Sequence, residues 1–142
     1  MIAAFFGFAL VCHATGITRA QGMDDLRGEW VGERLEIGVG KSLFQDWIKG
    51  VTLEITGEEI VFKGADGKPP TKLKYRLRQD KSPKQIDVMD EKKVYEGIYK
   101  LEGEVLTIYI ANYPDKKRPA QFKESPESND YSLMVLKRKG SN

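Results

Sequence analysis

Carboxylates are the side chains in this sequence best suited to acid–base chemistry. The candidates for an acid–base pair are Asp87, Asp90, Glu91, Glu96, Glu102 and Glu104. A glycosidase, for example, needs two carboxyl groups roughly 5–10 Å apart across a cleft, one as acid and one as base or nucleophile. The sequence places no two of them in this way, because most fall at expected turns or on outward strand faces. We therefore expect solvated surface charges and no catalytic residue.

Asp87 departs from this pattern. It lies between Ile86 and Val88, both of which are expected to point into a core. A carboxylate in such a place needs a partner, because burying an unpaired charge is costly. We expect Asp87 to cap a turn or to pair with a lysine.

Cysteine and histidine chemistry is confined to the first residues of the chain. The only cysteine is Cys12 and the only histidine is His13. If this segment is removed, the mature chain has no disulfide, no thiol nucleophile, no histidine base and no Cys/His zinc site. Asp66-Gly67 and Asn129-Asp130 lack the regular spacing of a calcium loop. We therefore expect neither a metal nor a cofactor.

The N-terminal segment reads as a signal peptide. Residues 2–12 form an uncharged apolar run of the length of a signal core, and mostly small or polar residues follow up to Ala20. Cleavage after Ala20, or after Ala14, would release a periplasmic or secreted protein. We expect a signal over residues 1–20 and one domain over residues 21–142. A retained membrane anchor and a lipid anchor on Cys12 are the alternatives, although the run is short for a membrane span.

The charge balance argues against a nucleic-acid partner. The chain has 23 Lys and Arg against 21 Asp and Glu, and one of the basic residues, Arg19, belongs to the signal. Two short basic groups, at residues 116–118 and 137–139, lack the net charge and interleaved aromatics of a nucleic-acid surface. We also expect no transmembrane span in the mature chain.

Alternation with a period of two runs through most of the mature region and indicates half-buried strands. Residues 71–79 show it best, because Leu73, Tyr75 and Leu77 alternate with Lys and Arg. The expected strands, eight in all, cover residues 28–37, 51–55, 60–62, 71–79, 85–89, 94–101, 104–111 and 131–138. One short helix is expected over residues 42–49. Strands at this spacing predict an all-β fold, an antiparallel lipocalin-like barrel.

The expected inward residues are bulky. A barrel of eight strands either fills with its own side chains or holds one small ligand. We therefore expect a mostly packed interior, with at most a shallow apolar pocket near one mouth, rimmed by Trp47 and residues 112–128. The residues expected to point inward are Leu53, Ile55, Phe62, Leu73, Tyr75, Leu77, Tyr99, Leu101, Leu106, Ile108, Leu133 and Val135.

An L-x-G-x-W motif, with Gly28 and Trp30, opens the first expected strand. At the start of a lipocalin-like barrel, such a tryptophan seals the floor, and a basic side chain from the last strand lies across its ring. Arg138 or Lys137 would supply that cation. We expect Gly28, Trp30 and Arg138 to be structural.

The chain resembles an uncharacterised family of small exported lipocalin-like domains that is abundant in planctomycete bacteria. The matching segments are residues 26–30, 66–68, 83–87, 97–106 and 118–122 with 133–138. One departure is Tyr109-Ile110, where relatives often carry a cysteine. The resemblance implies the barrel fold but no activity and no catalytic residue.

Large aromatic side chains are numerous for so small a barrel: Trp47, Tyr75, Tyr95, Tyr99, Tyr109, Tyr113 and Tyr131. They suit core packing, and they also suit a ligand site. We expect ligand contacts from Trp47, Tyr75, Tyr99 and Tyr113.

We expect the protein to be a non-enzymatic exported binding module. Its partner would be a small apolar ligand in the barrel or another exported protein. The alternatives are an interaction or inhibitor domain of the cell envelope and a carboxylate-dependent hydrolase.

Overall fold

The computed structural model is a closed antiparallel barrel of eight strands, which confirms the predicted fold class. It describes residues 26–38, 48–64, 66–123 and 128–140. The strands are β1 (Gly28–Ile37), β2 (Thr52–Ile55), β3 (Glu59–Lys63), β4 (Thr71–Arg78), β5 (Lys84–Asp90), β6 (Lys93–Glu102), β7 (Val105–Ala111) and β8 (Tyr131–Arg138).

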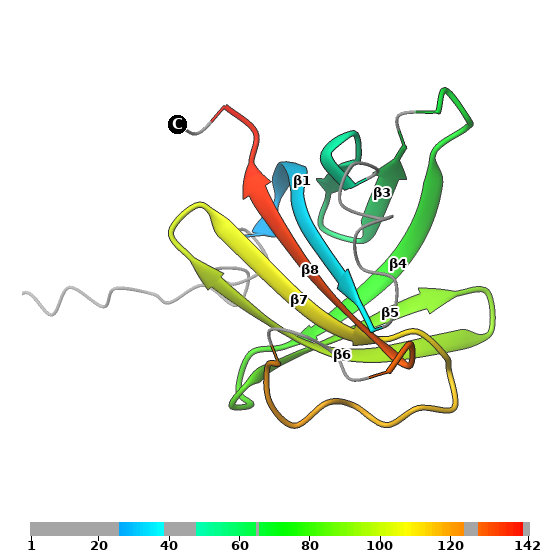
Figure 1. Ribbon diagram of the computed structural model, residues 1–142, viewed down its shortest axis with the longest axis vertical. Helices are drawn as coiled ribbons and strands as arrows, with labels where there is room; N and C mark the ends of the chain where they lie inside the picture. The colour runs from blue at the N-terminus through cyan, green and yellow to red at the C-terminus, as the bar shows by residue number, and fades with distance from the viewer. Residues whose placement is uncertain (1–25, 39–47, 65, 124–127, 141–142) are drawn as a thin grey trace, which may run out of the picture.

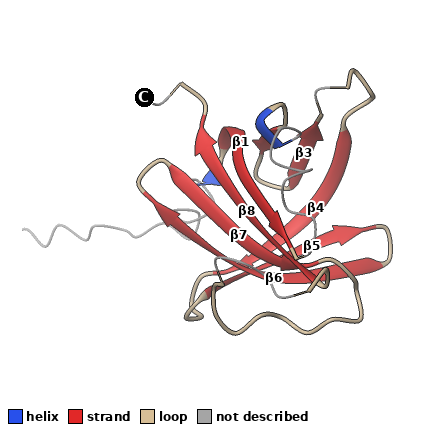
Figure 2. Cartoon of the chain, viewed as in Figure 1, coloured by secondary structure: helices blue, strands red, loops and turns tan. Residues whose placement is uncertain are grey.

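Each strand pairs with the next one along the chain, and β8 closes the barrel by pairing with β1. Figure 1 shows β1, β7 and β8 side by side on one wall. Figure 2 shows that nearly all of the described chain is strand or connecting loop. This up-and-down order is the architecture of lipocalins.

The barrel interior is filled by one connected apolar cluster to which all eight strands contribute. Its fully buried members include Trp30, Ile86, Leu106 and Leu136. Because alternate residues of a strand face opposite sides, each strand adds every second side chain to this cluster. The outer wall is therefore where polar and charged residues gather.

Trp30 forms the floor of the barrel. Its side chain is 0% exposed, and its indole Nε1–H donates to the carbonyl oxygen of Leu26 at 2.9 Å. Arg138 lies opposite Trp30 in the β1–β8 register, with its guanidinium 4.3 Å from the centre of the ring. A Cβ on Gly28 would lie 3.2 Å from Nη1 of Arg138, and Gly28 has a φ of +133°, so glycine suits this position in both respects.

The expected orientation of β8 is wrong at two positions. Leu136 belongs to the interior cluster and Met134 packs against it, so the alternate residues Leu133 and Val135 face outward. Residues 133–136 are apolar on both faces of the strand, so the period-two pattern does not distinguish inside from outside there. Leu133 is nevertheless buried, in a second cluster on the outer wall.

A short segment, residues 48–51, packs against the inner side of β1. Ile48 and Val51 are 0% exposed, and the backbone N–H of Gly32 donates to the carbonyl oxygen of Val51 at 2.9 Å. A Cβ on Gly32 would lie 2.2 Å from the carbonyl oxygen of Ile48. Only glycine therefore allows this close approach.

We expect Gly32→Ala to lower the free energy of unfolding by about 1–3 kcal/mol, the usual cost of overpacking a core. Gly103→Ala is the control, since nothing lies within 4 Å of its Cβ position and its φ is +60°. Its left-handed backbone alone should cost about 1 kcal/mol. Urea denaturation of both variants measures the two costs, and a Gly32→Ala variant as stable as the parent would contradict the close approach.

Several expectations fall on residues that the structure does not describe. The signal segment lies wholly outside the described residues, and so do residues 42–47 of the expected helix; the last two, Ile48 and Lys49, are helical. Within the described ranges, no helix has the length and apolar character needed to cross a membrane.

Candidate binding site under the strap

A long connection between β7 and β8 runs along the outside of the barrel. We call its described first part, residues 112–123, the strap. Pro114 and Pro119 lack the backbone N–H that a sheet ladder requires, so the strap lies against the wall without joining the sheet. Figure 1 shows it leaving β7 and passing across the outside of β6.

The strap covers apolar side chains on the outer wall. Ile98 of β6, Tyr109 of β7 and Leu133 of β8 form a buried cluster there, and Phe122 of the strap packs against it. Without this cover, three large apolar residues would face water. The strap therefore adds a small second core outside the barrel.

Arg118 anchors the strap to β5 and β6. Its Nη1 donates to the carbonyl oxygens of Gly97 at 2.8 Å and Ile86 at 3.2 Å. Its Nη2 lies 2.6 Å from Oδ1 of Asp87 and 3.4 Å from Oε1 of Glu96. Only 13% of the Arg118 side chain is exposed. One guanidinium thus ties the loop to two strands through four acceptors.

Asp87 is the centre of this anchor, and its partners are arginines and not the expected lysine or turn. Besides Arg118, Nη2 of Arg76 lies 2.9 Å from Oδ2 of Asp87, and Nη2 of Arg78 lies 3.5 Å from the same oxygen. Burial by itself raises the pKa of Asp87, but the hydrogen bonds from Arg76 and Arg118 and the nearby positive charges outweigh it. The net result is a pKa below its ordinary value, so Asp87 is held as an anion.

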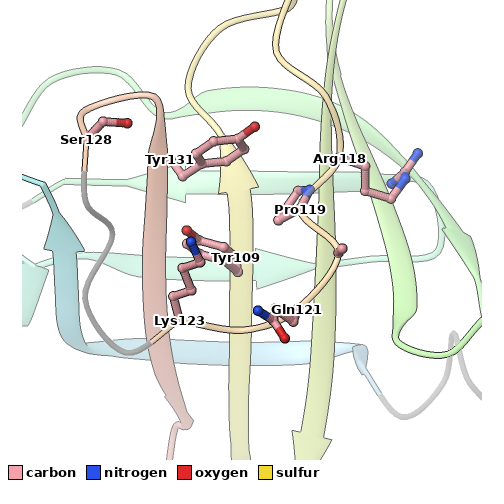
Figure 3. Close-up of a pocket in the computed structure, with 8 residues that line it drawn as sticks. Tyr109, Arg118, Pro119, Gln121, Lys123, Ser128 and Tyr131 are labelled. Carbon is pink, nitrogen blue, oxygen red and sulfur yellow. The ribbon is translucent and has the colours of Figure 1, made fainter.

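A pocket of about 390 Å³ lies between the strap and the strands β7 and β8. Figure 3 shows its lining residues gathered around one hollow, with the Arg118 side chain directed away from it. This volume falls within the range of small-molecule sites. The lining residues are Tyr109, Arg118, Pro119, Ala120, Gln121, Lys123, Ser128 and Tyr131.

The lining combines aromatic faces with polar groups. The rings of Tyr109 and Tyr131 lie 5.7 Å apart and are tilted by 32°, and the Tyr131 hydroxyl donates to the carbonyl oxygen of Lys117 at 2.9 Å. Gln121 and Lys123 add an amide and an ammonium group. Such a pocket can hold a ring against Tyr131 and hydrogen-bond its polar or anionic substituents.

The residues expected to bind a ligand are not brought together. Tyr75 and Tyr99 both lie in the interior cluster, 7% and 3% exposed, and burial raises the pKa of Tyr75. Tyr113 lies on the strap and is 48% exposed, away from the pocket lining. Trp47 falls outside the described residues. Ligand contacts from these four remain a prediction.

Acid–base chemistry at Asp87 would need a free carboxyl oxygen, and both of its oxygens accept hydrogen bonds from guanidinium groups. In the described part of the chain, no three Asp, Glu, His or Cys side chains are grouped as a metal site requires.

Sequence reasoning missed the anchor because its parts are far apart in the chain. Arg118 stood in a short basic group and Asp87 in a strand, 31 residues away. The available signals were a single acidic residue on an outward strand face and an Arg-Pro step in a long loop. Neither signal predicts that Asp87 and Arg118 form an ion pair, because pairing across such a distance depends on the path of the strap.

Comparison with known proteins does not assign this chain to a family. No protein-family model, no curated protein and no solved structure matches this chain. The resemblance to exported lipocalin-like domains therefore stays a prediction, and the function has to be argued from the site itself.

Proposed function

We propose that this protein is an exported, non-enzymatic binding module that takes a small polar ligand in the strap pocket. The observation that carries the proposal is the pocket itself, about 390 Å³ with aromatic, amide and ammonium groups around it. The filled barrel interior argues against the apolar ligand first considered, because bulky side chains from every strand already occupy that space.

The pocket's chemistry favours a ring-bearing anion, such as a sugar acid. Tyr131 offers a ring face, Gln121 offers an amide, and Lys123 offers a positive charge. Its walls also have firm support, because Arg118 holds the adjoining strap to the barrel through buried acceptors. A supported pocket loses less entropy when it binds a ligand.

We expect glucuronate to bind and to shift the backbone amide resonances of Gln121 and Tyr131 in NMR titrations of ¹⁵N-labelled protein. Glucose, which lacks the carboxylate, should bind more weakly. Lys123→Gln should weaken glucuronate binding by about tenfold, the value of one charge-assisted hydrogen bond. Lys117→Gln is the control, because Lys117 is exposed on the same strap but does not line the pocket.

Two results would overturn this proposal. One is the absence of any shift along the strap at millimolar glucuronate. The other is a response centred on Tyr75 and Tyr99, which would place the ligand in the barrel interior.

A further inference from the structure

The outer face of β4 carries a row of four cations, which we call the β4 row: Lys72, Lys74, Arg76 and Arg78. All four residues are exposed, while Leu73, Tyr75 and Leu77 between them are more buried. Alternate residues of an antiparallel strand are about 6.8 Å apart, so the row is roughly 20 Å long. The four charges therefore follow one another in a single row along the outer face of β4.

The neighbouring strands neutralise only part of the β4 row. In the register, Val61 and Glu59 of β3 and Met89, Asp87 and Gln85 of β5 stand opposite its members. Four cations thus face two carboxylates. No described carboxylate forms an ion pair with Lys72 or Lys74. Arg76 and Arg78 share Asp87, yet their side chains remain 57% and 43% exposed.

We propose that the β4 row is a docking surface for a linear acidic polysaccharide, a sugar polymer that carries carboxylate or sulfate groups. Charge complementarity argues for a polyanion, since a regular line of cations matches a chain of regularly spaced anions. Arginine forks also suit carboxylate and sulfate oxygens, which they bind through two parallel hydrogen bonds.

The surroundings of the β4 row favour a polysaccharide over other polyanions. Single-stranded nucleic acid binds to cations interleaved with aromatic side chains on which bases stack, and none of the residues opposite the row is aromatic. A membrane surface requires a broad basic face, commonly with exposed apolar residues. This row is narrow, and Glu59 stands beside it in the register.

This inference does not depend on the strap pocket. The β4 row lies on β4, and none of its residues lines that pocket. The two proposals can therefore fail separately. Binding of glucuronate at the strap says nothing about the β4 row, and loss of polymer binding leaves the pocket unaffected.

The test measures binding of the full chain to polygalacturonate, which carries carboxylates, and to dextran sulfate, by fluorescence anisotropy of labelled polymers at increasing salt. Neutral dextran, single-stranded DNA and vesicles containing phosphatidylserine serve as comparison probes. The variant Lys72→Gln/Lys74→Gln removes two charges and leaves the Asp87 ion pairs intact. The matched control Lys117→Gln/Lys137→Gln removes two charges from the strap and β8, away from β4.

We expect binding to at least one acidic polysaccharide, weakening as salt increases, and none to dextran. Each surface lysine contributes roughly fivefold at an anionic surface, so the β4 variant, which lacks two, should bind roughly twenty-five-fold more weakly than the parent. The control variant should retain most of the affinity. Equal losses in both variants, no binding to either acidic polymer, or stronger binding to DNA or vesicles would each overturn the proposal.

Discussion

We expect Trp30→Ala to lower the free energy of unfolding by about 3–5 kcal/mol, the usual cost of truncating a buried large aromatic. Trp30 is wholly buried and belongs to the interior cluster. Its removal would open a cavity at the barrel floor and leave Arg138 without the ring on which it lies. Because single domains are stable by only about 5–15 kcal/mol, much of the fold's stability should be lost.

Trp30→Phe is the matched control for the floor. Phenylalanine keeps an aromatic ring but has no donor for the carbonyl oxygen of Leu26, which accepts from the indole at 2.9 Å. We expect a loss of about 1–2 kcal/mol, from one hydrogen bond and a smaller cavity. Urea denaturation monitored by circular dichroism measures both variants. An unchanged midpoint for Trp30→Ala would contradict the place of Trp30 in the core.

The second large effect is expected at Asp87. Asp87→Asn should lower the free energy of unfolding at pH 7 by about 3 kcal/mol, the lower end for breaking a buried ion pair. The amide has the carboxylate's shape but not its charge, so Arg118, only 13% exposed, would lose its closest anion. The side chains of Arg76 and Arg78 are about half exposed, so water screens their charges. Losing their ion pairs with Asp87 should therefore cost little.

The effect of Asp87→Asn should depend on pH in a defined direction. The folded protein holds the pKa of Asp87 below its ordinary value of 3.8. A lowered pKa in the folded state means that the charge adds its full stability above the ordinary pKa and loses it as the pH falls through the folded pKa. The difference between parent and variant should therefore be constant near neutrality and shrink below about pH 4.

Asp90→Asn is the control, because Asp90 is exposed on the same strand. A surface substitution of this kind should change stability by no more than about 0.5 kcal/mol. Urea denaturation at pH 7, 5, 4 and 3 compares the three proteins. If the difference in unfolding free energy between the parent and Asp87→Asn is as large at pH 3 as at pH 7, the effect is steric and the ion-pair explanation fails.

The barrel was predictable from the sequence because its signal is local. Alternation with a period of two marks strands wherever one side of a sheet is buried, and the bounds of β1 and β8 agree with the expected ranges 28–37 and 131–138. Turns such as Asp66-Gly67 separate the strands. The place of Trp30 in the first strand and of Arg138 in the last follows from the same pattern.

The same local rule fails where both faces of a strand are covered. Leu133 and Leu136 are both apolar and both buried, one under the strap and one inside the barrel. Hydrophobicity along β8 therefore cannot distinguish inside from outside. The register with β1 and β7 decides it, and a register is a relation between strands.

The sequence by itself determined an all-β chain with about eight strands, a bulky inward set and no cysteine or histidine after residue 13. Only the tertiary structure decided where the strap pocket lies. The strap pocket brings together Tyr109, Tyr131 and the strap, and its anchor joins Arg118 to Asp87 across 31 positions. Strand alternation arises from each residue and its near neighbours, whereas the pocket and anchor arise from the path of one loop across a closed barrel.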